Sequence, residues 1–202
     1  MAWKLSTVAA ATGLGVVLTI LLASAVLDVP PDPFTRDPAG QVPELPFYAG
    51  SVSVLTAVVW GAVATAASIA AWLGPRPLRR GLALLVLLAL ALLADDALMV
   101  HETLAPRIGV PEEALYLAYT ATAVAVAWHL RHGPDRRPLR VLLVAGGLLA
   151  VSVALDVAIP ESPMGLLVED GIKLVGALVL ATVPAIALAP AVPTRTQHST
   201  AA

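Results

Sequence analysis

Long apolar stretches alternate with short polar ones along the chain, and this pattern predicts membrane-spanning helices. Each stretch is close to the roughly 20 residues that a helix needs to cross a hydrocarbon core of about 30 Å. The six stretches are Leu5–Leu27, Phe47–Leu73, Gly81–Glu102, Glu112–Leu130, Leu139–Ala158 and Gly165–Ala189. Their apolar residues occupy all sides instead of alternating with polar ones, which favours helices over the strands of a barrel. We therefore predict an all-α polytopic membrane protein, with one domain over residues 1–189 in which six helices form three hairpins.

The segments between and after these helices are polar. Residues 28–46 form a Pro-rich, acidic loop, and residues 190–202 form a tail that we expect to be disordered. Pro184 predicts a kink near the end of the last helix. The first stretch also resembles a cleavable signal peptide, because Lys4 precedes the apolar run and Ala23-Ser24-Ala25 follows it. Its apolar run is longer than a typical signal-peptide core, which favours a retained helix, and cleavage would leave the later topology unchanged.

The charged residues predict the orientation of the bundle. Nine of the 12 Lys and Arg residues fall in the terminal segments and the loops on one side, where the only acid is Asp135. The other 13 of the 14 acids fall toward the opposite side. Since Lys and Arg accumulate in cytoplasmic loops, we predict a multi-pass protein of the cell membrane with both termini in the cytoplasm.

Composition agrees with this class and removes several chemistries. The chain is 58% hydrophobic and 13% charged, with a mean hydropathy of +0.86, which excludes an ordinary soluble protein. It has no cysteine, so disulfides and thiolate metal or redox sites are excluded. The expected partners are membrane lipid and a cation or small solute, with no nucleic acid. The oligomeric state is not predicted by the sequence.

Several ionisable residues are predicted to lie inside the outer half of the membrane. At about 1.5 Å of rise per residue, Asp95 and Asp96 lie roughly 22–24 Å from Arg80 along their helix. A lone charge at such depth costs about 2.5–3.5 kcal/mol, so these groups are expected to face one another or a water-filled cavity. The predicted ion- or proton-binding site contains Asp95, Asp96, His101, Glu102, Glu112, Glu113, Asp156, Glu169, Asp170 and Lys173.

Spacing suggests the partners within this layer. Lys173 lies three residues after Asp170 and four after Glu169, which places it beside both acids on one helix face. Asp96 reaches the same depth from another helix and is a further candidate partner for Lys173. Asp95 and Glu102 are seven residues apart, so a continuous helix would place them on one face.

A divalent metal ion is the one cofactor that the residues suggest. His101 can act as a metal ligand, a proton carrier or a hydrogen-bonding group. Within the helix predicted over Gly81–Glu102, no two potential ligands stand at the three- or four-residue spacing that would let one helix chelate an ion, so a metal site must be assembled from several helices. The candidate metal ligands are His101, Asp96, Glu102, Glu113, Glu169 and Asp170.

Three functional hypotheses follow from this layer, and the sequence does not decide whether the protein is an enzyme. The first is a membrane protein whose acidic, His-containing site binds a cation or relays protons for small-solute transport or sensing. The second is a metal-dependent enzyme that acts on a lipid or other apolar substrate at the extracytoplasmic leaflet. The third is a structural membrane subunit held together by a buried salt-bridge network.

Overall fold

The computed structural model describes residues 2–28, 32–35, 49–158 and 162–189. Within these residues the chain is helical and contains no strand. The elements are α1 (Ala2–Leu27), α2 (Asp32–Thr35), α3 (Ser51–Leu73), α4 (Arg76–Leu98), the π-helix η2 (Val100–Leu104), α5 (Ala105–Arg107), α6 (Glu112–Leu130), α7 (Arg137–Ala158), α8 (Pro163–Ala181) and α9 (Val183–Leu188). The predicted all-α class is therefore confirmed.

Five helical segments of the described chain are long and apolar enough to cross a membrane. They are Trp3–Val26, Ser51–Leu73, Arg76–Leu98, Arg137–Ala158 and Met164–Leu188. The helix predicted over Glu112–Leu130 forms with these bounds as α6, but it is not one of the five. Its lower apolarity has a local cause, since Glu112 and Glu113 occupy its first turn and two tyrosines follow within the next two turns.

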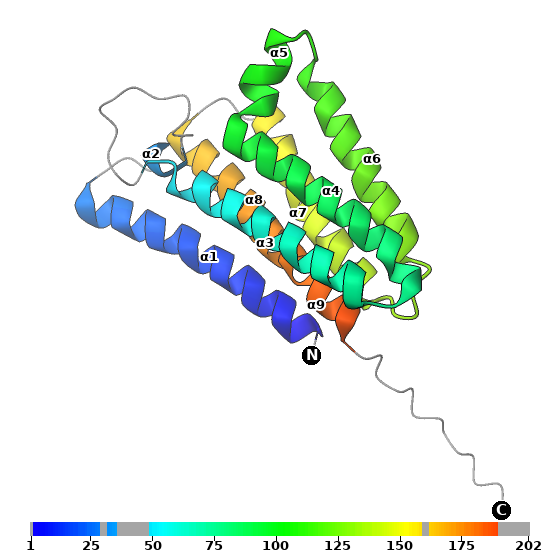
Figure 1. Ribbon diagram of the computed structural model, residues 1–202. Helices are drawn as coiled ribbons and strands as arrows, with labels where there is room; N and C mark the ends of the chain where they lie inside the picture. Colours follow the sequence, from blue (N-terminus) through cyan, green and yellow to red (C-terminus); the bar gives the residue numbers. More distant parts are fainter. Residues whose placement is uncertain (1, 29–31, 36–48, 159–161, 190–202) are drawn as a thin grey trace, which may run out of the picture.

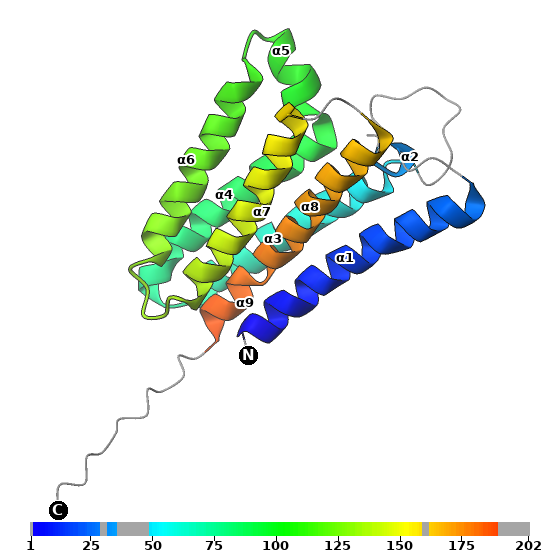
Figure 2. The ribbon, with the colours of Figure 1, turned by 180° about the vertical axis from the view of Figure 1, so that it is seen from behind.

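Successive long helices run in opposite directions, so α1 begins and α9 ends at the same end of the bundle (Figures 1 and 2). Helix α8 is the central element, with α1, α3 and α7 packed against it. In the most apolar part of the segment Met164–Leu188, which contains α8 and α9, 61% of the residues are buried, against 11% in that of Trp3–Val26. Helix α6 packs mainly on α4, at the side of the bundle away from α1 (Figure 1).

The two ends of the bundle differ in charge. At one end, called here the basic end, lie the start of α1, the turns α3–α4 and α6–α7, and α9. At the other, called here the acidic end, α4 leads into η2 and α5, α7 ends, and α6 and α8 begin. The helix termini that carry the predicted acids therefore lie together at the acidic end.

Glycines allow α1 to approach α8 closely. A Cβ at Gly13 would lie 2.9 Å from Val175 Cγ2, and one at Gly171 would lie 2.8 Å from Val17 Cγ2. The hydroxyls of Ser6 and Thr182 also form a buried hydrogen bond of 3.1 Å between these parts of the chain. Small residues at a helix contact are the usual means of packing helices where lipid removes the hydrophobic driving force.

Five of the six predicted helices begin at residues other than those predicted, namely Ala2, Ser51, Arg76, Arg137 and Pro163, and two of the six end differently. The helix predicted over Gly81–Glu102 ends instead at Leu98, because Met99 adopts a left-handed conformation with φ of 50°. The following turn is a π-helix, in which Leu104 N donates to Met99 O at 3.3 Å. The inference that Asp95 and Glu102 share a helix face assumed an unbroken α-helix, and that assumption was wrong.

The last predicted helix, Gly165–Ala189, is divided at Thr182 into α8 and α9. Pro184 has no N–H to continue the helical hydrogen-bond ladder, so the predicted kink is confirmed. The predicted loop over residues 28–46 is described only at residue 28 and at α2. Residues 47–48 and the predicted disordered tail, 190–202, lie outside the described residues.

Candidate functional site

Lys173 lies between two carboxylates at the acidic end. Its Nζ is 3.5 Å from Asp96 Oδ1 on α4 and 3.4 Å from Asp170 Oδ1 on its own helix, α8. The second oxygen of Asp96 accepts a hydrogen bond of 2.7 Å from Trp60 Nε1 on α3. Of the three partners predicted for Lys173, Asp96 and Asp170 are thus confirmed as contacts, and with Trp60 these contacts connect three helices.

These groups are largely removed from the molecular surface. The side chains of Asp96 and Asp170 are 10% and 14% exposed, and that of Lys173 is 26% exposed. Glu169 contributes a further negative charge that acts on Lys173. An ammonium group therefore already occupies the space between Asp96 and Asp170 that a bound cation would take.

Asp95 and His101 form a second pair beside the first. Oδ1 of Asp95 accepts hydrogen bonds from the main-chain N of His101 at 2.9 Å and lies 2.8 Å from its Nδ1. Asp95 is 4% exposed. The two residues are brought together by the break after Leu98, because the left-handed Met99 and the π-turn fold His101 back over the end of α4. π-turns of this kind occur frequently at functional sites.

A tyrosine on α6 extends this pair toward α7. The ring of Tyr116 lies 6.0 Å from that of His101, centroid to centroid. Its hydroxyl donates to Glu112, one turn earlier on α6, and lies 3.2 Å from Asp156 Oδ2 on α7. Tyr119, one turn further along α6, lies close enough to Asp95 and Asp96 for their negative charges to act on its hydroxyl.

The two groups together form one polar layer, because Asp95 and Asp96 are adjacent in the chain. The layer extends over α3, α4, η2, α6, α7 and α8. We call it the polar layer and define it by the residues with the contacts above: Trp60, Asp95, Asp96, His101, Glu112, Tyr116, Tyr119, Asp156, Asp170 and Lys173.

Three predicted site residues stand outside the set of residues that defines this layer. Glu113 is exposed on the first turn of α6, and no ion pair involves it within the described chain. The negative charge of Glu169 acts on Lys173, and its main-chain oxygen accepts a hydrogen bond of 3.2 Å from Ser152 Oγ. The side chain of Glu102 lies outside what the structure describes.

The predicted metal site is not supported by the geometry. Among the described residues, no group of three or more His, Asp or Glu side chains is arranged to hold a metal ion. The candidate ligands are distributed between separate contacts, since His101 pairs with Asp95 while Asp96 and Asp170 pair with Lys173. Metal binding therefore remains an untested prediction.

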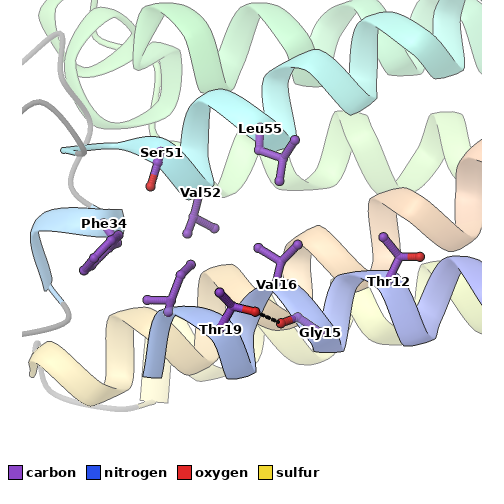
Figure 3. Close-up of a pocket in the computed structure, with 9 residues that line it drawn as sticks. Thr12, Gly15, Val16, Thr19, Phe34, Ser51, Val52 and Leu55 are labelled. Atoms are coloured by element: carbon purple, nitrogen blue, oxygen red, sulfur yellow. Dashed lines mark hydrogen bonds between the residues drawn. The ribbon is translucent and has the colours of Figure 1, made fainter. Parts of the chain in front are cut away.

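A cleft of about 460 Å³ opens between α1, α2 and α3, away from the charged groups (Figure 3). It is lined by Thr12, Gly15, Val16, Thr19, Ile20, Phe34, Ser51, Val52 and Leu55, none of which is charged. The hydroxyls of Thr12 and Thr19 donate to the carbonyls of Val8 and Gly15 in their own helix, at 2.9 and 2.8 Å. The cleft therefore presents a mainly apolar wall, and no residue of the polar layer lines it.

Three members of the polar layer, Trp60, Tyr116 and Tyr119, were not identified from the sequence as site residues. Trp60 is 1% exposed, and it lies far from the ends of α3. A tryptophan placed so far from a membrane interface could have indicated a polar partner inside the bundle, because a buried indole N–H needs a hydrogen-bond acceptor. Tyr116 was equally compatible with an interfacial anchor, and only the fold shows that its hydroxyl faces two acids.

Comparison with known proteins shows the family but no function. No curated protein and no solved structure is significantly similar to the chain. A family model described as "Domain of unknown function (DUF8692)" matches residues 9–187, which include every residue of the polar layer. The match covers most of the 202 residues, so the chain belongs to this family.

Proposed function

We propose that the polar layer binds and relays protons, in a protein whose six long helices cross the cell membrane with both termini in the cytoplasm. The relay would serve small-solute transport or sensing. The observation that carries this proposal is the contact between the buried carboxylate of Asp95 and the imidazole of His101, 2.8 Å apart. Both groups exchange protons, and histidine is the side chain suited to doing so near neutral pH.

The neighbouring contacts supply a route for a proton beyond this pair. Tyr116 lies beside His101 and its hydroxyl meets the carboxylates of Glu112 and Asp156. A hydroxyl has one proton, so it can donate to only one of two carboxylates at a time. A proton added to either acid completes the second hydrogen bond. The arrangement therefore accommodates one added proton without a change of partners.

The placement of α6 in the membrane is part of this proposal. Helix α6 is 19 residues long and packs along α4, which has the length and apolarity of a membrane span. Its polar side chains Glu112 and Tyr116 contact other members of the polar layer, which lowers the cost of placing them within the bilayer. Seven arginines in the turns at the basic end support a cytoplasmic location for that end.

Cation binding and metal-dependent catalysis receive less support. The space between Asp96 and Asp170 already holds the Lys173 ammonium group. No described group of three ligands gathers for a metal. A purely structural role accounts for the ion pairs of Lys173, which connect α4 to α8, but it gives no reason for the contact of Tyr116 with two acids.

The test measures proton uptake by the purified protein. Small acid pulses are added to weakly buffered protein in detergent, and a pH indicator reports the protons bound between pH 5 and 8. We expect Asp95→Asn and His101→Gln each to bind fewer protons than the parent. Glu113→Gln is the matched control, because it removes an exposed acid of the same end that has no ion pair among the described residues.

Equal uptake by the parent and both variants would contradict the proposal. Uptake that is lower in both variants but unchanged in the control would support it. Proton flux into vesicles that contain the protein would then separate the two roles. A transport relay conducts protons under an imposed gradient, whereas a sensor binds them without conducting.

A further inference from the structure

The basic end has a strong excess of positive charge that the polar layer does not use. The turns α3–α4 and α6–α7 and the first turns of the helices that follow them contain seven arginines and one acid. The arginines are Arg76, Arg79, Arg80, Arg131, Arg136, Arg137 and Arg140. The single acid, Asp135, is already occupied, since it pairs with the guanidinium of Arg137 and accepts from its main-chain N at 2.9 Å.

Packing brings the two arginine-bearing turns together. Gly133, in the α6–α7 turn, lies directly against the buried Leu78 in the first turn of α4. A Cβ at Gly81 would lie 3.1 Å from His129 Cβ, so the start of α4 also touches the end of α6. The arginines of both turns therefore belong to one surface and not to two separate loops.

Most of this charge is available to a partner. Arg76, Arg80, Arg136 and Arg140 are exposed, and none of them forms an ion pair within the described chain. We call these four residues the basic surface. No acid of the described chain pairs with them, so their charge is open to an anionic partner.

Aromatic side chains fix the depth of this surface. Trp72 is 79% exposed and Trp128 is 54% exposed at the same end of the bundle. The guanidinium of Arg131 stacks over Trp128, 3.2 Å from the ring centroid. Indole rings concentrate at the level of lipid headgroups, so the neighbouring arginines lie where lipid phosphates are.

We propose that the basic surface binds the headgroups of anionic phospholipids in the leaflet that it contacts. Clusters of four to eight Lys or Arg next to spanning helices attract anionic lipid, and each contributes about fivefold in affinity. The basic surface has four such arginines, with exposed indoles beside them. The described residues of these turns contain no unpaired acid, so the surface is complementary in charge to an anionic headgroup. Phosphatidylglycerol is the probe used. It has a phosphate, as phosphatidylcholine does, but carries a net negative charge, so comparing the two lipids isolates the effect of net charge.

The test uses the tryptophans at the basic end as reporters. The full chain is placed in nanodiscs of phosphatidylcholine with a small, fixed fraction of brominated phosphatidylglycerol or brominated phosphatidylcholine. Bromine quenches nearby tryptophan fluorescence, so the ratio of the two signals measures lipid preference. We expect phosphatidylglycerol to be preferred by about fivefold or more at low salt. The preference should fall at 1 M salt, where the screening length is about 3 Å.

Variants assign the preference to these residues. The quadruple variant Arg76→Gln, Arg80→Gln, Arg136→Gln, Arg140→Gln should lose it, and the corresponding four lysine substitutions should keep it. Arg107→Gln, which removes an exposed arginine in α5 at the acidic end, is the control and should also keep it.

Two results would overturn the proposal. One is an equal quenching by both lipids in the parent protein, which requires no variant. The other is a preference for phosphatidylglycerol that persists in the glutamine variant. If the glutamine variant does not insert into membranes, the parent and the lysine variant still test the proposal. A preference for phosphatidylglycerol that does not fall at 1 M salt, or that the lysine variant lacks, would contradict it.

Discussion

Replacement of Lys173 by methionine should destabilise the bundle more than any other single change in the polar layer. Methionine has a similar length and no charge, so the variant leaves Asp96 and Asp170 facing each other without the ammonium group between them. Both acids are mostly buried, so water compensates them poorly. Either they must take up protons or the helices must separate.

The distances give the size of the effect. With an effective dielectric constant near 20, opposite charges about 3.5 Å apart attract by roughly 5 kcal/mol, and Lys173 has two such partners. Most of this attraction offsets the cost of removing three charges from water. Removal of one partner of a buried ion pair typically costs about 3–5 kcal/mol, and we expect Lys173→Met to fall in this range at neutral pH.

The assay is reversible unfolding in mixed micelles, with the free energy of unfolding measured against the fraction of denaturing detergent. The double variant Lys173→Met, Asp96→Asn should recover about 1–3 kcal/mol, because an uncompensated charge is removed together with its partner. Asparagine at position 96 retains an oxygen that can accept from Trp60. Arg107→Met is the control for loss of a cation at the acidic end and should change stability by less than about 0.5 kcal/mol.

The reasoning is refuted if Lys173→Met unfolds at the same detergent fraction as the parent. That result would mean that Lys173 extends to the membrane surface and that the acids are solvated. A double variant no more stable than the single one would show that Asp96 is not the partner.

Three further changes test other parts of the structure. Tyr116→Phe should cost about 1–2 kcal/mol in unfolding free energy, because two carboxylates lose a hydroxyl partner; a neutral effect would remove this residue from the polar layer. Gly13→Leu should destabilise by about 1–3 kcal/mol by forcing α1 away from α8, whereas Gly15→Leu, which has nothing within 4 Å of its Cβ position, should not; equal effects in thermal unfolding would contradict the close helix contact. Met99→Val should be less stable than Met99→Gly by about 1–2 kcal/mol, since a β-branched residue is disfavoured at a φ of 50°; the reverse order would argue against the left-handed turn.

The fold was predictable from the sequence to the extent that it depends on apolar length. Stretches of Leu, Val and Ala gave the helices within a few residues, because a membrane span must satisfy its own backbone hydrogen bonds. The end of α4 was not predictable, since no Gly or Pro marks it; a left-handed Met99 and the carboxylate of Asp95 terminate the helix through contacts that spacing does not show.

The sequence predicted the depth of the polar layer in the membrane better than it predicted which side chains contact each other. Depth along each helix placed Asp96 and Lys173 at one level, and helical spacing placed Asp170 beside Lys173. The contacts of Trp60 and Tyr116 depend on how α3, α6 and α7 are rotated about their axes. Those helices are apolar on nearly all sides, so the sequence contains little information about rotation.

The central claim is that Asp95 and His101 form one proton-binding pair, and the titration of His101 tests it most directly. The chain has four histidines, so replacing His129, His132 and His198 by glutamine leaves His101 as the only imidazole signal in a labelled sample. Magnetic resonance spectra recorded from pH 5 to 9 should show His101 titrating, with a midpoint that differs between this background and the same background with Asp95→Asn, and that is unchanged by Glu113→Gln. An imidazole that does not titrate, or one whose midpoint is the same with and without the Asp95 carboxylate, would contradict the claim.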